Sequence, residues 1–533
     1  MKKKKITVVV SFVTIILGFF MALLDTTIVN ISLPKMAESF NCTLNQITWI
    51  SNSYNIALVV FMLTAARIAD QFGRKKLFMI NIALFTMISF CIGFSSTLSI
   101  IIILRVLQGI TAAFIIPVTI PLILEIVPEE KFGMIIGIWG ALAGLAAACG
   151  PALGGVLTQA YNWQSVFFVN LPFGIISLVI AGIVLNESYD TTASKYMDLK
   201  GIITISISIL SITLGLIQGP DKGWTSLYIL SLFVISIITL ILFLFAEFKS
   251  KDPMLPLWLL KIRAFSASCI TIIFATSGLM AGSFLIPFYL TKLIGMTQKG
   301  AGMTVMYMPL AMIIFSMIAG PLSQKFGSRI FGIIGILLLS VSLFSIGSLS
   351  IDFNRTDLIL RLIIAGAGLG MTIAPVIGGA IRVVPQEKVG IASAVTNVAR
   401  TFGMVLGIAI LTTLLNYNIR NETIQVNKNI ASNYIEKANI SQDLKTEITE
   451  NIINDSNYDS NKGFNDESII SVINQKREKD TIDDIYINAN VEAKTGYFKS
   501  YMNTFKTFSF ILLVGVIFAF YCEDKKKNIE VKN

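Results

Sequence analysis

Long apolar stretches, separated by shorter polar ones, recur along this chain of 533 residues. Fourteen of them reach the roughly 20 residues that an α-helix needs to cross the hydrocarbon core of a bilayer. They centre near positions 18, 57, 86, 111, 146, 175, 209, 236, 278, 311, 340, 369, 404 and 512. The pattern predicts an all-α integral membrane protein with fourteen transmembrane helices.

Polar features inside and beside these stretches occur twice at nearly constant spacing. Each copy has an arginine within an apolar segment, then a charged turn, and each is preceded by a related basic loop. A repeat at fixed spacing indicates a duplicated protein whose two halves face each other. The matching pairs are Arg105 with Arg361, Val127–Gly133 with Val384–Gly390, and Ala66–Lys75 with Gly320–Arg329.

The repeat also predicts the domains. We expect a six-helix bundle over 1–190, two inserted helices over 191–250 that have no counterpart, and a second six-helix bundle over 251–533. The long hydrophilic stretch 416–499 separates the last two apolar segments. We expect it to be a partly ordered extracellular loop, because long polar segments are exempt from the charge rule that orients short loops.

Basic residues gather on one side of the predicted membrane. With fourteen crossings both termini share a side, and most lysines and arginines of the short loops fall there. Cytoplasmic loops are enriched in such residues, so we expect both termini in the cytoplasm and a multi-pass protein of a bacterial plasma membrane. The net charge of +10 then reflects topology, and no nucleic-acid partner is expected.

The composition excludes several kinds of catalytic and metal site. The chain is 54% hydrophobic and 14% charged, and it contains no histidine. It therefore has no Ser-His-Asp triad and no H-E-x-x-H zinc site, and it lacks the G-x-x-x-x-G-K-[ST] phosphate loop. Its five cysteines are scattered and suggest no disulfide framework or metal site. We expect neither an enzyme nor a cofactor.

Asp25 is the most informative polar residue, because it lies in the outer half of the first apolar segment. A charge at that depth costs about 2.5–3.5 kcal/mol or more and usually serves a function. Burial favours the neutral carboxyl group, which makes Asp25 a candidate for proton exchange. The alternative is a structural aspartate bonded to Thr26, Thr27 or Asn30 at a helix bend.

Arg105 is the second buried charge, in a segment that is otherwise apolar. It needs a carboxylate or carbonyl groups as partners, and Asp25 is expected because both lie toward the outer half. Protonation of Asp25 would then release Arg105, which gives a switch. The alternative is an ion pair that holds the fold and does not titrate.

Three further groups of residues are candidates for gating or substrate contact. The glycine-rich segment 137–155 could seal against a neighbouring helix, although tight packing alone is the alternative. Asp70 and Arg74 flank Gly73 in a cytoplasmic turn that could equally be a solvated topology signal. Residues that could line a central cavity, or simply pack, are Tyr54, Gln108, Trp139, Tyr289 and Met306.

Several segments together resemble the major facilitator superfamily, and in particular its fourteen-helix drug:proton antiporters. The resemblance covers nearly the whole chain except 416–499. It departs at Ala66 and Gln71, where the superfamily loop has Gly and Arg, and at Ala146, where the antiporter motif has Gly. The segments that carry it are Leu24–Pro34, Ala66–Lys75, Leu104–Gly109, Gly137–Gly155 and Trp163–Gly174.

The resemblance implies the major facilitator fold and proton-driven export. It implies that Asp25 and Arg105 take part in proton coupling. The residues that it implies for conformational gating are Asp70, Gly73, Arg74, Gly150, Pro151, Gly154 and Gly155.

The substrate is less constrained. Relatives that export divalent cations have an acidic residue in the tenth helix, and Gly300–Leu322 has none. We therefore expect a proton-coupled exporter of lipophilic, cationic drugs or toxic compounds. The alternatives are an exporter of a native lipid, peptide or metabolite, and a non-transporting sensor or scaffold. The expected partners are a small lipophilic substrate, protons and the lipid bilayer, and the chain is expected to act as a monomer.

Overall fold

The computed structural model describes most of the chain and is helical throughout the described part. Among the described residues, thirteen helices are long and apolar enough to cross a membrane. The remaining predicted segment, near position 146, is the 29-residue helix α5 (Phe132–Ala160). The fourteen-helix prediction is therefore confirmed. The residues that are not described are 1, 43, 128–131, 190–197, 251–252, 254, 352–353, 431, 433–435, 437–444, 446–478 and 524–533.

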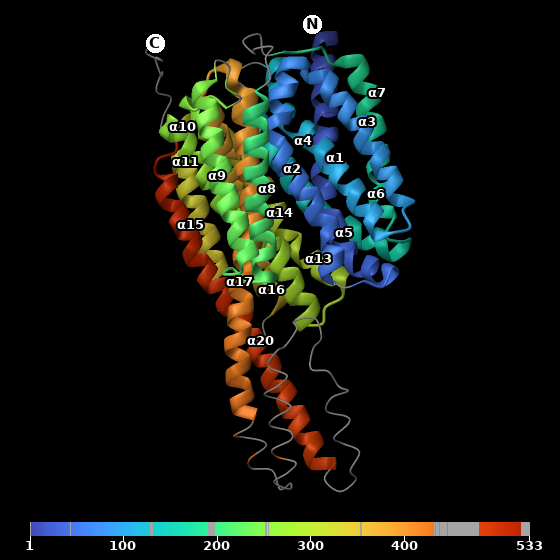
Figure 1. Ribbon diagram of the computed structural model, residues 1–533, viewed down its shortest axis with the longest axis vertical. Coiled ribbons are helices and arrows are strands. Elements are labelled where there is room, and N and C mark those ends of the chain that lie inside the picture. The colour runs from blue at the N-terminus through green and yellow to red at the C-terminus, as the bar shows by residue number, and fades with distance from the viewer. Residues whose placement is uncertain are drawn as a thin grey trace.

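The N-terminal half and the inserted pair follow the expected order (Figure 1). The N-terminal half comprises α1 (Lys2–Phe40), α2 (Leu44–Phe72), α3 (Arg74–Gly93), α4 (Leu98–Ile126), α5, α6 (Ser165–Phe168) and α7 (Asn170–Val184), and α8 (Leu199–Lys222) and α9 (Leu227–Lys249) form the inserted pair. α6 and α7 together form one crossing of the bundle, and each of the other elements forms a crossing by itself.

The C-terminal half is built the same way but has more breaks. Its first crossing changes from α-helical to π-helical turns around Pro287, a residue that cannot donate a backbone hydrogen bond. The elements are α10 (Trp258–Lys261), α11 (Arg263–Met280), η2 (Ala281–Leu285), α12 (Ile286–Phe288), η3 (Tyr289–Leu293), α13 (Gln298–Val305), α14 (Tyr307–Phe326), α15 (Ser328–Ile346), α16 (Arg355–Arg382), η4 (Gln386–Lys388), α17 (Val389–Ile430) and α20 (Lys479–Ala519).

One close helix–helix contact occurs at matching positions in the two halves. In the first half a Cβ on Gly109 of α4 would collide with the backbone oxygen of Tyr54 on α2. In the second half a Cβ on Gly366 of α16 would collide with the backbone oxygen of Met308 on α14. Glycine at both positions lets the paired helices approach closely, which supports the duplication read from the sequence.

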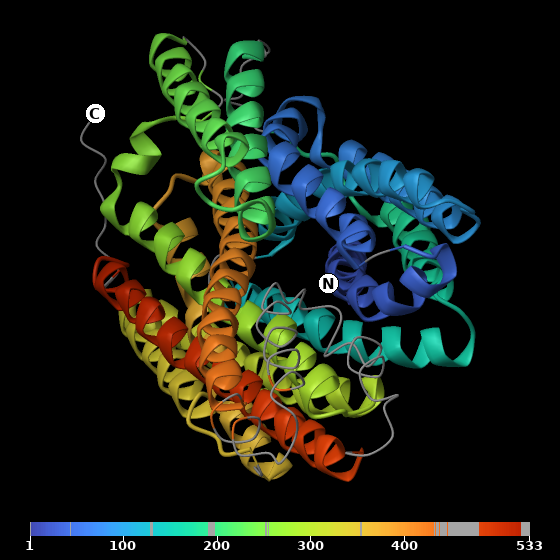
Figure 2. The same cartoon turned by 60° about the horizontal axis from the view of Figure 1, so that its bottom comes forward.

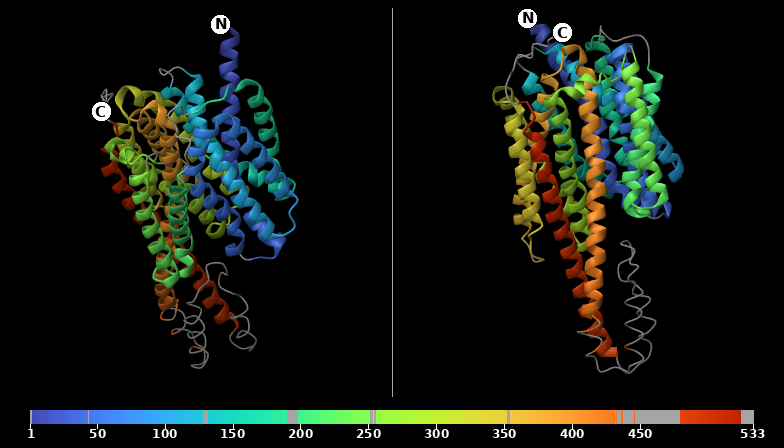
Figure 3. Two further views of the ribbon diagram at one scale, coloured as in Figure 1. Left: turned by 45° about the horizontal axis from the view of Figure 1, so that its top comes forward. Right: turned by 60° about the vertical axis from the view of Figure 1, so that its left-hand side comes forward.

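The halves lie side by side, with the inserted pair against them (Figure 2). α5 of the first half packs along α14 of the second, and α2 packs along α17. α8 contacts both α2 and α17, so the inserted pair covers one seam between the halves. The beginning of α1 and the end of α20 lie at the same end of the bundle (Figures 1 and 3).

The predicted partly ordered loop over 416–499 is helical at both flanks. α17 continues to Ile430 and α20 begins at Lys479, so two antiparallel helices project beyond the bundle (Figure 3). They are paired by apolar contact, with Val426 and Ile430 buried on α17 and Gly496 seated against Val426. The Asn418 amide also donates to the Thr504 hydroxyl at 3.0 Å. The middle of the predicted loop lies outside the described residues.

Candidate functional site

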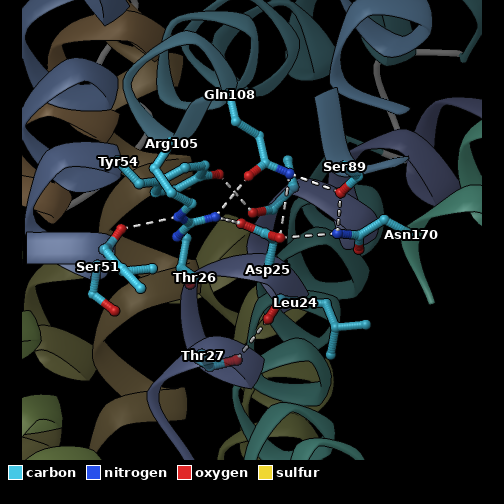
Figure 4. A network of polar contacts seen from close by, with 12 residues as sticks. Leu24, Asp25, Thr26, Thr27, Ser51, Tyr54, Ser89, Arg105, Gln108 and Asn170 are labelled. Atoms are coloured by element: carbon cyan, nitrogen blue, oxygen red, sulfur yellow. Dashed lines mark hydrogen bonds and ion pairs between the residues drawn. The ribbon is translucent and has the colours of Figure 1, made fainter. Parts of the chain in front are cut away.

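Asp25 on α1 and Arg105 on α4 form an ion pair inside the N-terminal half (Figure 4). The Arg105 Nη1 donates to the Asp25 Oδ2, and the side chains are 1% and 0% exposed. The expected partner was therefore the right one. A buried pair offsets the desolvation of both charges only when their remaining hydrogen-bonding groups are also satisfied.

The second Asp25 oxygen is held by two amides. Gln108 was selected from the sequence as a cavity residue, whereas the sequence contained no reason to select Asn170. The Asn170 Nδ2 on α7 donates to the Asp25 Oδ1 at 2.8 Å, and the Gln108 Nε2 approaches it at 3.4 Å. Both amides also donate to the Ser89 hydroxyl oxygen on α3, at 2.9 and 2.8 Å. Asp25 is thus bonded to α4 and α7, and Ser89 connects the two amides to α3 (Figure 4).

Arg105 is held on its other sides as well. Its Nε donates to the backbone oxygen of Ile50 at 2.9 Å, and its Nη1 also reaches the Gln108 Oε1 at 2.8 Å. The Tyr54 ring lies under the guanidinium, 4.2 Å from its central carbon, and the Tyr54 hydroxyl donates to Ala22 O at 3.0 Å. A cation over an aromatic face gains electrostatic stabilisation that grows as water is excluded.

The polar residues next to Asp25 do not hold its carboxylate. Thr26 and Thr27 donate to the backbone oxygens of Leu23 and Leu24, one turn earlier in α1. Asn30 instead accepts a hydrogen bond from the Ser51 hydroxyl of α2 at 2.7 Å. The reading of Asp25 as an aspartate bonded within its own helix bend therefore does not describe this site.

The glycine-rich part of α5 packs directly behind Asp25. A Cβ on Gly150 would collide with the Thr27 hydroxyl, and one on Gly154 would lie 2.6 Å from the backbone oxygen of Ile28. Pro151 lies between them, within the helix. Gly155 differs, because a Cβ there would have no neighbour within 4 Å. Of these three glycines, Gly150 and Gly154 are required for the close approach of α5 to α1.

A second buried pair closes one end of the interface between the halves. The Arg74 Nε of α3 donates to the Asp70 Oδ1 of α2 at 2.8 Å, and both residues are buried. Asp70 lies against the first turn of α17 in the other half, where a Cβ on Gly390 would come within 2.5 Å of its carboxylate. A carboxylate there is favoured by the partial positive charge at a helix N-terminus. Arg74 Nη1 also lies 3.7 Å from Glu125 at the end of α4.

Gly73 separates the two charged residues of this pair. Its φ of 109° is one that side-chain-bearing residues rarely adopt. A Cβ on it would also lie 2.7 Å from the carboxyl carbon of Glu187. Glu187 in turn accepts from the backbone N–H groups of Lys75 and Lys76 at 2.8 and 3.0 Å, which caps the start of α3.

The five candidate cavity residues lie in four different places. Tyr54 and Gln108 belong to the Asp25 network. Trp139 of α5 is buried, stacks on Phe19 at 4.6 Å between ring centroids, and donates to the Thr119 hydroxyl at 3.2 Å. Tyr289 packs against two aromatic rings of α20, and Met306 lies at the joint of α13 and α14. The structure therefore does not bring the five together.

Arg361 matches Arg105 in the sequence repeat but has a different environment. It is 20% exposed and pairs with Asp357, one turn earlier in its own helix, at 2.7 Å. Its Nη1 also donates to the backbone oxygen of Ser345. The reason is local: Asp357 supplies a carboxylate within reach, and no acid lies at 279–282, the positions that match Asp25 in register.

Two matching halves of membrane-spanning helices, with a buried carboxylate–guanidinium pair inside one of them, define the fold of a secondary transporter. The profile of the Major Facilitator Superfamily matches residues 15–408. The chain belongs to this superfamily.

Relatives and solved structures agree with that assignment. The chain is 30% identical over 409 residues to the tetracenomycin C resistance and export protein of Streptomyces glaucescens, which covers 76% of this chain and 75% of the relative. It is 30% identical to the riboflavin transporter RibZ of Clostridioides difficile, in a match that covers 78% of this chain and 90% of the relative. A POT family transporter bound to a thioalcohol-conjugated peptide superposes with a TM-score of 0.56 at 17% identity, covering 77% and 90%.

Proposed function

We propose that this protein is a proton-coupled antiporter that exports lipophilic compounds, antibiotics among them, across a bacterial plasma membrane. The observation that carries the proposal is the Asp25–Arg105 pair, which is buried in one half of a superfamily member. Relatives named for tetracenomycin C export and for multidrug resistance support export as the direction of transport.

The proposed coupling step is a proton transfer to Asp25. The neutral carboxyl group no longer attracts the guanidinium, so Arg105 keeps only its bonds to Ile50 O and Gln108. The loosened network connects α1, α3, α4 and α7, and a change in it alters how these helices fit together. Loss of the proton on the other side of the membrane restores the ion pair and resets the cycle.

The contact between α1 and α5 carries this change toward the interface of the halves. Thr27, two residues after Asp25, donates to the backbone oxygen of Ala146 on α5 at 3.2 Å. α5 in turn packs along α14 of the other half. A shift of α1 driven by Asp25 therefore reaches the seam that must open, while the Asp70 contact with α17 holds the opposite seam closed.

The energy available is sufficient for export. One proton that moves down a membrane potential of 100 mV supplies roughly 2.3 kcal/mol. That free energy supports a substrate concentration ratio of roughly fifty-fold, because each 1.4 kcal/mol corresponds to a factor of ten. A pH gradient adds to this ratio.

We place both termini in the cytoplasm, which puts the two projecting helices outside the cell.

Reconstituted vesicles test the proposal. Purified protein is inserted into liposomes that contain a pH-sensitive dye, and anionic, neutral and cationic lipophilic probes are added under an imposed proton gradient. We expect at least one probe to move against its gradient and to carry a counterflow of protons. A sensor or scaffold produces neither movement, and that result would refute the proposal.

Two variants locate the proton site. Asp25→Asn removes the titrating group while keeping the shape, and we expect coupled transport to fall to the level of empty vesicles. Asp357→Asn removes the same charge from the matching half and should leave transport within about two-fold, because Asp357 is 45% exposed and only pairs with a neighbour. Equal effects of the two variants would remove Asp25 from the mechanism.

Export of a native metabolite is the second candidate. It is favoured by the relative named as a riboflavin transporter, of which the match covers 90%. Comparing the metabolites retained by cells that lack the protein with those retained by cells that carry it separates this candidate from drug export. Accumulation of one metabolite, with unchanged sensitivity to drugs, would favour it.

A further inference from the structure

We infer that Arg400 of α17 forms the binding site for the anionic group of an amphiphilic organic substrate. The inference rests on the proposed transport function and names its substrate class. It also changes the expectation from the sequence, which favoured lipophilic cations. The Asp25 carboxylate is already neutralised by Arg105, whereas Arg400 is a buried cation without a described counter-ion.

Arg400 lies deep in the membrane and faces the other half. It follows Val389, the first residue of α17, by eleven positions, or about 16 Å at 1.5 Å per residue, near the middle of a 30 Å hydrocarbon core. Its side chain is 6% exposed, and its guanidinium carbon lies 5.4 Å from the centre of the Trp139 ring on α5. Arg400 therefore spans the interface between the halves.

No described carboxylate neutralises Arg400. Its Nε has no hydrogen-bond partner in the described part of the chain, and the contact with Trp139 is its sole polar interaction there. The buried acids of the described part are bonded elsewhere: Asp25 to Arg105, Asp70 to Arg74, and Glu247 to the backbone N–H of Leu255. An aromatic face compensates a buried cation only in part, so the site is completed by an anion that the protein itself does not supply.

Two further polar residues lie on the same face of α17. Ser393, Asn397 and Arg400 follow at spacings of four and three, which places them in one row along a helix. The Ser393 hydroxyl donates to the backbone oxygen of Pro117 on α4, so the row faces the N-terminal half. Asn397 is 1% exposed; its Nδ2 donates to Ser393 O at 2.9 Å, while its Oδ1 has no partner among the described residues.

The surroundings define the rest of the ligand. The indole of Trp139 lies between the Phe19 ring and the guanidinium, so the site combines an aromatic wall with one positive charge and one amide. Such a combination recognises an apolar or aromatic body that bears a carboxylate or an acidic phenol. A guanidinium binds a carboxylate through two parallel hydrogen bonds, which an ammonium group does not reproduce.

Binding of two xanthene dyes to the purified protein in detergent tests the inference. Fluorescein carries negative charge, and a rhodamine ester has a similar ring system but positive charge. We expect fluorescein to bind at least ten-fold more tightly than the rhodamine ester, as measured by fluorescence anisotropy. Equal affinity, a preference for the rhodamine ester, or no binding of fluorescein would overturn the inference.

Three variants assign the charge to Arg400. We expect Arg400→Gln to weaken fluorescein binding at least ten-fold without weakening the rhodamine ester, and Arg400→Lys to retain part of the affinity. Arg420→Gln removes the same charge from an exposed position of the same helix and should leave both dyes unaffected. An equal loss of fluorescein binding in Arg420→Gln would mean that general surface charge, not this site, attracts the dye.

Thermal unfolding without ligand separates a binding role from a structural one. If the counter-ion of Arg400 is an external anion, the buried charge is uncompensated in the protein without ligand. The Arg400→Gln variant removes this charge and should therefore unfold at the same or a higher temperature than the wild type. A clear drop in unfolding temperature would show that Arg400 holds the fold together and would overturn the inference. The binding assay needs no proton gradient, so loss of transport with intact dye binding would refute only the proposed function.

Discussion

Arg105 in the N-terminal half and Arg361 in the C-terminal half occupy matching places, seven and six residues after α4 and α16 begin. Arg105 is buried and reaches across the bundle to Asp25 on α1. Arg361 is partly exposed and pairs with Asp357 on its own helix. Gly109 and Gly366 follow these arginines by about one helical turn, and each packs against a backbone oxygen of the neighbouring helix.

The comparison shows that the two halves share their helix packing but differ in their buried charges. Helix packing is preserved in both halves, because each half must bury the same close contacts to stay folded. The buried charge pair is present in one half, because a deep carboxylate is costly wherever it has no function. Under the proposed function, the N-terminal half therefore carries the proton-coupling pair, and the inferred cargo site at Arg400 of α17 lies at the interface with the C-terminal half.

The largest expected difference between the halves is in the stability cost of losing each arginine. Arg105→Ala leaves Asp25 buried without its partner, which costs about 3–5 kcal/mol when one member of a buried pair is removed. Arg361→Ala breaks a partly exposed pair and should cost about 1 kcal/mol or less. Thermal unfolding of the purified variants in detergent gives both values.

A double variant separates the effect of the unpaired charge from the effect of shortening the Arg105 side chain. Asp25→Asn combined with Arg105→Gln removes both charges and keeps hydrogen-bonding groups, so it should be more stable than Arg105→Ala. If Arg105→Ala and Arg361→Ala have equal effects, the distinction between the halves is wrong.

The next comparison concerns the glycine pair and predicts equal effects. Gly109→Ala and Gly366→Ala each place a methyl group against the backbone of a neighbouring helix, which cannot move aside as a flexible side chain would. Each should cost about 1–3 kcal/mol, as overpacking does in well-packed cores. Gly155→Ala is the matched control, because its Cβ would meet open space. A cost for only one of the two would show that packing has diverged as well.

The turns before α3 and α15 give a smaller effect. Gly73 and Gly327 have φ values of 109° and 82°, where a Cβ is strained. Substitution of either by alanine should lower stability by about 1–2 kcal/mol. Gly73→Ala should also reduce transport, since Gly73 joins Asp70 to Arg74, whereas Gly327→Ala should affect stability alone. Unfolding and vesicle transport of the same preparations distinguish the two results.

The smallest effect concerns how these two helices are capped. The Arg74 N–H donates to Ser188 O and the Arg329 N–H to Glu523 O, both at 3.0 Å, so the backbone cap is duplicated. The Glu187 carboxylate adds two further bonds in the first half. Glu187→Ala should therefore cost about 0.5–1 kcal/mol. An unchanged unfolding temperature would mean that water replaces the carboxylate without loss.

Much of this architecture was readable from the chain alone. Length and apolarity of a segment are local properties, so all fourteen crossings could be placed without a structure. The partnership of Asp25 with Arg105 followed from depth, since two opposite charges at one level of a low-dielectric layer have few other ways to be stabilised. The flanks of 416–499 were missed because their helices are polar outside the membrane and are stabilised by packing against each other.

What the sequence alone determined was therefore which residues cross the membrane, at what depth, and in which repeat. Tertiary structure decided which of them meet: Asn170 and Ser89 with Asp25, Arg361 with its own helix, and Arg400 with Trp139. The physical reason is rotation. A helix surrounded by lipid and by other apolar helices is apolar on every side, so its sequence does not mark the face that turns inward, and only packing fixes that angle.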